Sequence, residues 1–127
     1  MWSLSTAGFR IPLRPNAGDM TLHVTPGSNH ITVAVDGRVS VDSSPNLRSA
    51  LLDLLRRKAS PLIYIELSGV SYLDTSGLAT LLEALKAARE RSVILRVTGI
   101  GGAARTLAEI AQLDTIFRAW GSEVEFR

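Results

Sequence analysis

Four consecutive residues, Asp74, Thr75, Ser76 and Gly77, combine a carboxylate with two hydroxyls. A threonine or serine hydroxyl can accept a phosphoryl group, which brings about −1.5 to −2 charges at neutral pH. Aspartate is also a common helix cap, because its carboxylate accepts hydrogen bonds from the free backbone N–H groups of a first helical turn. The pattern therefore predicts either an exposed hydroxyl that can be modified or only a capped helix start.

The flanking segments place this tetrapeptide between a strand and a helix. Residues 62–67 form a short apolar run rich in β-branched and aromatic side chains, which is typical of a buried strand. Over residues 78–88, apolar side chains recur at helical spacing and charged side chains take the opposite face. Asp74 is thus the expected N-cap. The helix dipole and the N–H groups of the first turn would favour a phosphate on Thr75 or Ser76.

Patterns along the rest of the chain predict a small α/β domain. Residues 21–25 and 31–35 alternate apolar and polar side chains around the turn-forming stretch 26–29, which predicts an antiparallel hairpin. The remaining predicted elements are a helix that ends near Lys58 and whose cap and N1 proline are supplied by Ser43-Ser44-Pro45, a strand at 93–97, a helix at 103–112 and a last short strand at 123–126. The expected order is β-β-α-β-α-β-α-β, in a mixed sheet with helices mainly on one face.

One domain is expected over residues 19–127, because the chain of 127 residues is long enough for a single hydrophobic core. Residues 1–18 have neither helical nor strand periodicity and are interpreted as a flexible N-terminal extension. Cysteine is absent, which excludes a disulfide framework and a thiolate metal site. The sequence has no signal-peptide core and no membrane-spanning apolar run, so we expect a cytoplasmic protein without direct membrane insertion.

Charge and motif content argue against several other classes. The 14 basic and 12 acidic residues give a net charge of +2 and are scattered, so no nucleic-acid interface is predicted. His23 and His30 have no further ligand at metal spacing, which predicts no metal site. Segment 99–104 matches a dinucleotide-binding pattern, but no acidic residue follows at the end of a later strand, so we expect no cofactor. Ser76 lacks the glycine that a nucleophile elbow needs two residues earlier, and no enzymatic activity is predicted.

The order of elements and several local sequences resemble the STAS domain, the fold of bacterial anti-sigma factor antagonists and of several transporter-associated modules. The similarity extends from the first hairpin to the final strand. The residues that carry it are Gly37-Arg38-Val39, the stretch from Leu67 to Leu78, Val97-Thr98-Gly99, and the stretch from Leu107 to Phe117. The resemblance implies a small STAS-like fold over residues 19–127.

In such antagonists, the hydroxyl residue directly after the aspartate accepts a phosphoryl group from an anti-sigma factor that is itself a serine/threonine kinase. The matching residue is Thr75, with Ser76 as a minor alternative acceptor. The resemblance implies a partner switch that regulates transcription: the unphosphorylated domain binds the kinase, a sigma factor is released, and the phosphorylated domain does not bind. The partner-binding residues implied are Asp74, Thr75, Ser76, Gly77 and Leu78, and no catalytic residue is implied.

The same resemblance implies a second function. The STAS subunit of a Gram-negative phospholipid-trafficking ABC transporter also carries Asp-Thr, a small residue and Gly-Leu-Ala, which Gly77-Leu78-Ala79 matches. That domain binds an ABC transporter ATPase with a threonine at the contact, so Thr75 would be a docking residue without any need for phosphorylation. These two functions, and a scaffold domain whose hydroxyls only cap a helix, stay open. The oligomeric state and the identity of the partner stay open as well.

Overall fold

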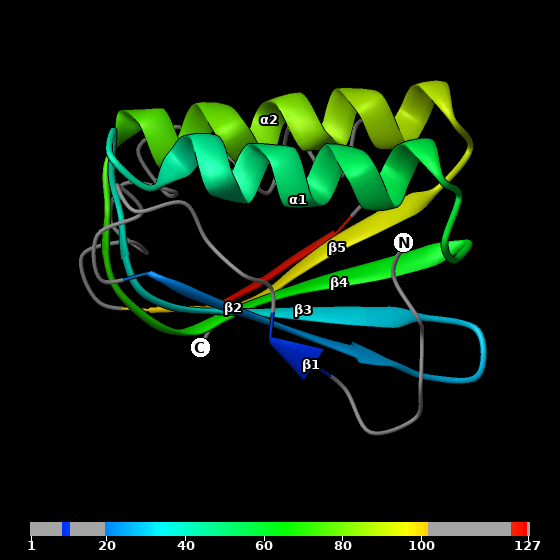
Figure 1. The fold of residues 1–127 in the computed structure, drawn as a ribbon, viewed down its shortest axis with the longest axis horizontal. Helices are drawn as coiled ribbons and strands as arrows, with labels where there is room; N and C mark the ends of the chain where they lie inside the picture. Colours follow the sequence, from blue (N-terminus) through cyan, green and yellow to red (C-terminus); the bar gives the residue numbers. More distant parts are fainter. Residues whose placement is uncertain (1–8, 11–19, 102–122, 127) are drawn as a thin grey trace.

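A six-stranded sheet with two helices on one of its faces makes up the part of the chain that the structure describes. This computed structural model describes residues 9–10, 20–101 and 123–126. Helices α1 (Ser44–Arg56) and α2 (Thr75–Glu90) lie side by side above the sheet (Figure 1). The strands, in their order across the sheet, are β1 (Phe9–Arg10), β2 (Thr21–Pro26), β3 (Ile31–Val39), β4 (Leu62–Leu73), β5 (Ile94–Ile100) and β6 (Glu123–Phe126).

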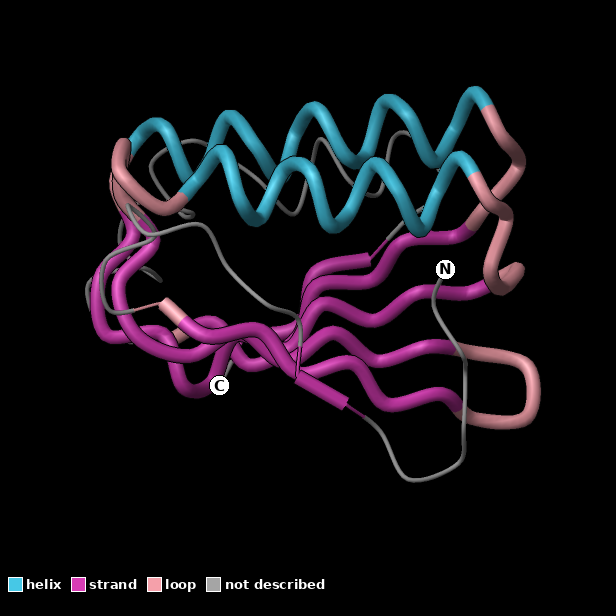
Figure 2. Tube along the Cα trace, in the orientation of Figure 1, coloured by secondary structure: helices cyan, strands magenta, loops and turns pink. Residues whose placement is uncertain are grey.

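The sheet is mixed, as predicted. Strands β2 and β3 form the predicted antiparallel hairpin, and β1 pairs antiparallel with the free edge of β2. Strands β3, β4, β5 and β6 are parallel to one another, and a crossover through α1 or α2 joins the first three. Figure 2 shows the strands as one twisted layer with the helices on one side. The predicted last strand is confirmed as β6, whereas the predicted helix at 103–112 lies outside the described residues.

The expectation that all of residues 1–18 form a flexible extension is wrong for two residues. Phe9 and Arg10 pair with β2 and add an edge strand to the sheet. An edge strand offers a row of backbone N–H and C=O groups to any neighbouring segment. A two-residue strand has no side-chain period, so no sequence pattern indicates it. The domain boundary at residue 19 otherwise stays a prediction.

Strand β4 continues past its predicted end to Leu73, over 12 residues in all. Its second half pairs with the end of β3, after register shifts that follow Ala34 and Gly37. Such irregularities bend a strand and increase its twist. Figure 1 shows both strands curving, at the left, toward the first turns of α1 and α2. The ends of β3 and β4 therefore lie beside the two helix N-termini.

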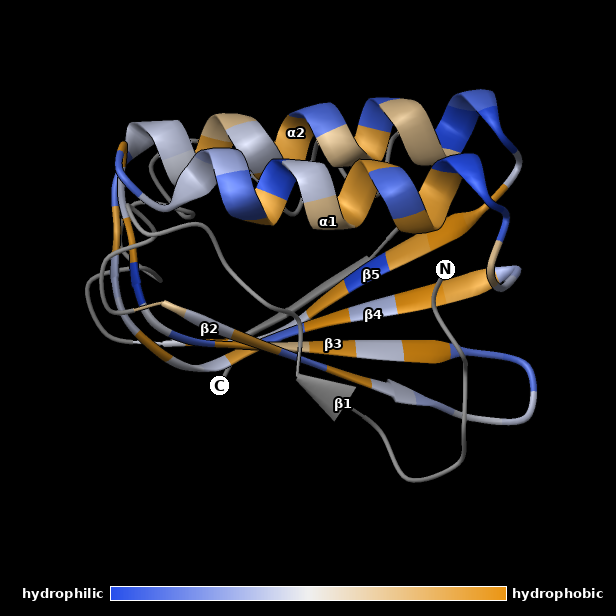
Figure 3. Ribbon diagram, in the orientation of Figure 1, coloured by the Kyte–Doolittle hydropathy of each residue, from blue (hydrophilic) through white to orange (hydrophobic). Residues whose placement is uncertain are grey.

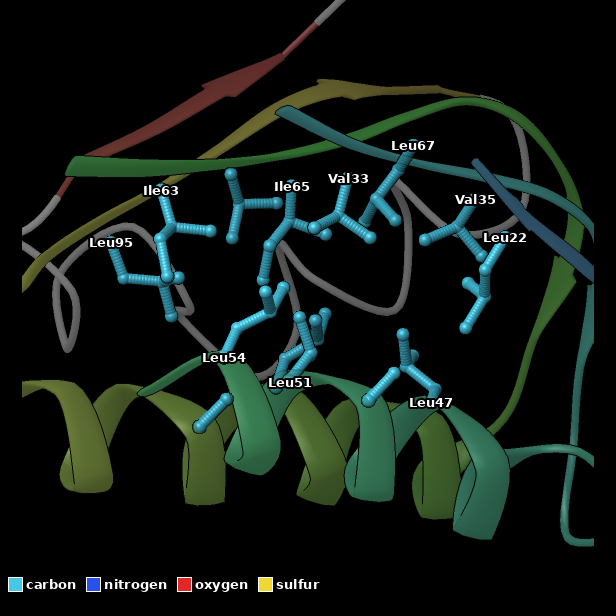
Figure 4. Packing of buried hydrophobic residues seen from close by; sticks show 14 of the residues in the cluster. Leu22, Val33, Val35, Leu47, Leu51, Leu54, Ile63, Ile65, Leu67 and Leu95 are labelled. Carbon is cyan, nitrogen blue, oxygen red and sulfur yellow. The ribbon is translucent and has the colours of Figure 1, made fainter. Parts of the chain in front are cut away.

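The hydrophobic core lies between the helices and the sheet. Successive side chains of a strand point to opposite faces, so every second strand residue faces the helices. Figure 4 shows Val33, Ile65 and Leu95 of the strands directed toward Leu51 and Leu54 of α1, and all five are buried. Figure 3 shows hydrophobic residues concentrated in β3, β4 and β5. Neither α1 nor α2, the helices that the structure describes, is long and apolar enough to span a membrane.

Candidate functional site

The first turn of α2 is fixed by its N-cap, Asp74. Asp74 Oδ1 accepts hydrogen bonds from the backbone N–H of Gly77 at 3.1 Å and from the Ser76 hydroxyl at 2.5 Å. Asp74 Oδ2 accepts a hydrogen bond from the backbone N–H of Val41 at 3.2 Å, in the turn that links β3 to α1. The predicted capping role is confirmed. The same carboxylate also ties the start of α2 to the neighbouring turn.

The Asp74 carboxylate carries a negative charge at neutral pH. Burial has the largest single influence on its pKa and raises it, but hydrogen bonds from the Ser76 hydroxyl and from the N–H groups of Gly77, Ser76 and Val41 favour the charged form. Together these bonds outweigh burial and hold the pKa of Asp74 below its ordinary value of 3.8. Because Asp74 already accepts from the N–H groups of Ser76 and Gly77, a phosphate on Thr75 would share these two groups with the carboxylate, and the stabilisation of such a phosphate stays a prediction.

The two hydroxyls of the tetrapeptide lie in different environments. Ser76 is half-buried, donates to Asp74 and accepts a hydrogen bond from the Ser44 hydroxyl at 3.3 Å. Thr75 is exposed, and within the described residues no hydrogen bond engages its hydroxyl. A phosphoryl group on Ser76 would remove the hydrogen bond that this hydroxyl donates to Asp74 and would set a second negative charge against the capping carboxylate. A phosphoryl group on Thr75 would leave the cap intact.

Gly77 and Leu78 lie beneath the turn and are buried. A Cβ atom on Gly77 would lie 2.5 Å from Leu73 Cδ1 and 2.8 Å from Val39 Cγ1, so the absent side chain lets α2 approach the ends of β3 and β4. The Leu78 side chain is 8% exposed and joins the core. Both residues are therefore largely covered in the free chain, and the expectation that they touch a partner stays a prediction. Their role is to fix the position at which α2, and with it Thr75, meets the strand ends.

Two exposed hydrophobic side chains near this turn were missed by the sequence analysis. Val41 is 69% exposed in the turn after β3, and Tyr72 is 36% exposed near the end of β4. The Arg38 guanidinium lies 4.1 Å from the centroid of the Tyr72 ring, in a cation–π contact. The sequence signal that could have identified Val41 is a hydrophobic residue within an otherwise polar turn. We refer to the side chains of Val41, Tyr72 and Thr75 as the turn surface.

The turn that carries Val41 is held in place by its own hydrogen bonds. The Ser43 hydroxyl donates to the Arg38 carbonyl at 2.7 Å and accepts from the Ser40 N–H at 2.9 Å. The Ser40 hydroxyl accepts from the Asp42 N–H at 3.3 Å. Within the predicted capping stretch Ser43-Ser44-Pro45, Ser43 is the N-cap residue of α1, but its hydroxyl bonds within the turn and makes no capping hydrogen bond. Val41 is therefore presented on an ordered turn.

Comparisons with known proteins assign the chain to a family. Residues 22–118 match the family described as "Mlab, STAS domain". The anti-sigma-B factor antagonist of Listeria monocytogenes is similar to this chain, with 30% identity over 98 residues, which cover 77% of this chain and 85% of the relative. That match and the family match span most of the elements described above.

Solved structures share the fold. The anti-sigma factor antagonist from Mycobacterium paratuberculosis matches with a TM-score of 0.71 and 24% identity, over 82% of this chain and 86% of the other. The Bacillus cell fate determinant SpoIIAA in its phosphorylated form matches with a TM-score of 0.62 and 10% identity, over 81% and 89% of the two chains. Its unphosphorylated form matches with a TM-score of 0.59 and 12% identity, over 79% and 98%. The chain therefore belongs to the STAS domain family, and proteins named as anti-sigma factor antagonists are among its relatives.

Proposed function

We propose that the protein is an anti-sigma factor antagonist that binds a serine/threonine kinase anti-sigma factor while Thr75 is unphosphorylated and releases it once Thr75 carries a phosphate. The observation that carries this proposal is the exposed Thr75 hydroxyl, which stands at the first residue of α2 outside the hydrogen bonds of the cap. The names of the relatives support an antagonist function. The solution of SpoIIAA in phosphorylated and unphosphorylated forms supports phosphate control in a protein of this fold.

The turn surface supplies the chemistry for docking. Val41, in the turn after β3, and Tyr72, near the end of β4, offer exposed apolar area. The exposed Thr75 adds a hydroxyl next in sequence to Asp74, which the Val41 N–H contacts. Apolar groups framed by a few polar ones are the usual composition of a protein-binding surface. An unphosphorylated turn surface is thus suited to a partner that covers it and removes it from water.

A phosphate on Thr75 would oppose this docking through charge. It would add about −1.5 to −2 charges next to the Asp74 carboxylate, whose lowered pKa keeps it ionised. A partner that covers both groups must remove their water, which costs several kcal/mol for each ion that it does not pair. The Thr75 hydroxyl takes no part in the cap, so the switch requires no rearrangement of α2.

The test uses affinity pull-downs from the native cell lysate with wild-type protein and three variants, Thr75→Ala, Thr75→Glu and Ser76→Ala, followed by mass spectrometry. We expect wild type and Thr75→Ala to retain a serine/threonine kinase that Thr75→Glu does not retain. Incubation of the recovered kinase with ATP should phosphorylate wild type and Ser76→Ala at Thr75 and should leave Thr75→Ala unmodified. A kinase retained equally by wild type and Thr75→Glu, or phosphate found on Ser76, would refute the proposal.

The same experiment distinguishes the second function implied by the sequence. Recovery of an ABC transporter ATPase, with retention lowered by both Thr75→Ala and Thr75→Glu and unaffected by ATP, would favour a transporter subunit. In that case the turn surface would still be the contact, because Val41 and Tyr72 are exposed whichever partner covers them. Only the role of Thr75 would change, from a regulated residue to a docking residue.

A further inference from the structure

An open groove with a hollow of about 290 Å³ lies between α1 and α2. The residues that line it are Arg48, Ser49, Leu52, Arg56, Ala87 and Arg91. In α1, Arg48, Leu52 and Arg56 are spaced four residues apart and form a stripe along the helix. In α2, Ala87 and the C-cap residue Arg91 have the same spacing and form a second stripe. We refer to this feature as the helix groove. Figure 1 shows the two helices running alongside each other over their whole length.

One end of the helix groove carries cationic side chains with little compensation. The Arg56 guanidinium lies 3.9 Å from Asp53, whose carboxylate makes a shorter contact of 3.0 Å with Arg57. Among the residues that the structure describes, no carboxylate lies within ion-pair distance of Arg91. Arg56 is the last residue of α1 and Arg91 is the C-cap of α2, so their charges lie at the same end of the helix pair.

The rest of the helix groove is apolar or neutralised. Leu52 and Ala87 are half-buried and form an apolar floor, and the small Ala87 side chain leaves the hollow open. At the end nearer the helix starts, Arg48 forms an ion pair with Glu83 across the two helices. The helix groove therefore combines an apolar centre with a positive charge at one end.

We infer that the helix groove binds an acidic segment of a partner protein, with an apolar side chain of that segment on Leu52 and Ala87 and its carboxylates at Arg56 and Arg91. Guanidinium groups suit this ligand because their planar N–H groups bind carboxylates in pairs. An extended anionic surface such as a membrane fits less well. It would meet the carboxylates of Asp53 and Glu83, which the same helices carry beside the arginines.

This surface is separate from the turn surface. Ala87 follows Thr75 by twelve residues in α2, which corresponds to about 18 Å along the helix axis at 1.5 Å per residue. At about 0.15 M salt, exposed charges more than about 8 Å apart are largely screened from each other. Binding in the helix groove is therefore expected to be independent of the charge on Thr75, and it goes beyond the proposed switch.

Fluorescence anisotropy with a labelled peptide, Glu-Glu-Leu-Glu-Glu-Leu-Glu, tests the inference on the full chain, and a peptide with glutamine at every glutamate is its control. We expect the acidic peptide to bind about tenfold more tightly than the neutral one and to weaken as salt is raised. Amide NMR shifts should move around Leu52, Ala87 and Arg91. The double variant Arg56→Glu/Arg91→Glu should raise Kd about tenfold or more. Arg89→Glu, an exposed charge reversal outside the groove, should leave Kd unchanged.

Several results would overturn the inference. They are equal binding of the two peptides, shifts confined to other surfaces, or an equal loss of affinity in Arg89→Glu. Vesicles of phosphatidylcholine and phosphatidylserine that bind through Arg56 and Arg91, without peptide binding, would assign the groove to a membrane instead. Thr75→Glu should bind the acidic peptide as wild type does, so failure of the proposed switch and failure of this inference are distinguishable.

Discussion

The first turns of α1 and α2 stand at the same end of the sheet and use similar residues differently. In α1 the first helical residue, Ser44, is 6% exposed and donates a hydrogen bond to Ser76. In α2 the first helical residue, Thr75, is exposed and engages no described residue through its hydroxyl. The Ser43 hydroxyl bonds within the turn between β3 and α1 and does not cap its helix. Asp74 caps α2 and also accepts a hydrogen bond from the Val41 N–H of that turn.

This difference shows how one of these hydroxyls stays outside the hydrogen bonds of the fold. The bonds of Asp74, Ser43 and Ser76 hold the two first turns together without any contribution from Thr75. The fold therefore does not depend on the Thr75 hydroxyl, and a change at that residue can alter the surface while the interior stays as it is. The variants below test this contrast between the first turn of α1, whose serine hydroxyls are bonded, and the first turn of α2, where the Thr75 hydroxyl is accessible.

Gly77→Val should have the largest effect on stability. The new side chain would meet Leu73 and Val39, whose atoms lie 2.5 and 2.8 Å from the position of a Cβ. Overpacking of this kind should lower the free energy of unfolding by about 3 kcal/mol. Urea denaturation followed by circular dichroism would measure it. Ala79→Val, at an exposed position of α2, is the matched control and should cost only about 0.5 kcal/mol through helix propensity.

Asp74→Ala should be the next most damaging change. It removes the cap of α2 and leaves the Val41 N–H without its acceptor. We expect a loss of about 2 kcal/mol in the free energy of unfolding, at the upper end for a helix cap. Asp74→Asn keeps an acceptor for the Gly77 N–H and should lose less. Equal losses in the two variants would show that the charge, rather than the cap, stabilises this turn.

Ser43→Ala tests the first turn of the other helix. It leaves the Ser40 N–H and the Arg38 carbonyl without the hydroxyl that joins them, which should cost about 1.5 kcal/mol. The variant loses no helix cap, because Ser43 does not cap α1 through its side chain. Hydrogen exchange should therefore increase in the turn at residues 40–43 more than in the first turn of α1. Faster exchange confined to α1 would contradict the assigned role of Ser43.

The lowered pKa of Asp74 predicts a loss of stability in acid. As the pH falls, the unfolded chain takes up a proton at the ordinary pKa of 3.8, before the folded chain does. The stabilisation is therefore complete above that value and is lost as the pH falls from 3.8 through the lower pKa of the folded state. Glu83, whose pKa Arg48 lowers through a hydrogen bond, contributes in the same direction. Unfolding of wild type and Asp74→Asn between pH 2 and 7 should isolate the Asp74 component as the difference between the two curves.

The sequence predicts those parts of the fold that short-range patterns determine. Alternation in the hairpin and leucine spacing in α2 correspond to elements that the structure contains, and the capping of α2 by Asp74 is likewise a local contact three residues long. The extension of β4 to Leu73 is different, because residues 68–73 carry no strand pattern and are ordered by pairing with β3. Backbone pairing between distant segments leaves little trace in either sequence.

The candidate site likewise contains features that the local sequence predicts and features that depend on contacts between distant residues. The tetrapeptide identifies Asp74 and Thr75 because their types are informative by themselves. It does not distinguish the accessible hydroxyl from the engaged one, since Ser76 is half-buried through a contact with Ser44, 32 residues away. Val41 was missed for a similar reason. It reaches the site through the Asp74 carboxylate, across 33 residues of chain.

Thr75→Ala and Ser44→Ala give the finest test of the contrast, because both residues stand first in their helices. Thr75→Ala removes an exposed hydroxyl that no described residue binds, and it should change the free energy of unfolding by less than about 0.5 kcal/mol. Ser44→Ala removes a buried hydroxyl from the bond to Ser76 and should cost about 1 kcal/mol. Paired denaturation curves would resolve this difference. If Thr75→Ala proved the more destabilising of the two, its hydroxyl would belong to the fold, and a switch that leaves the fold unchanged could not act through it.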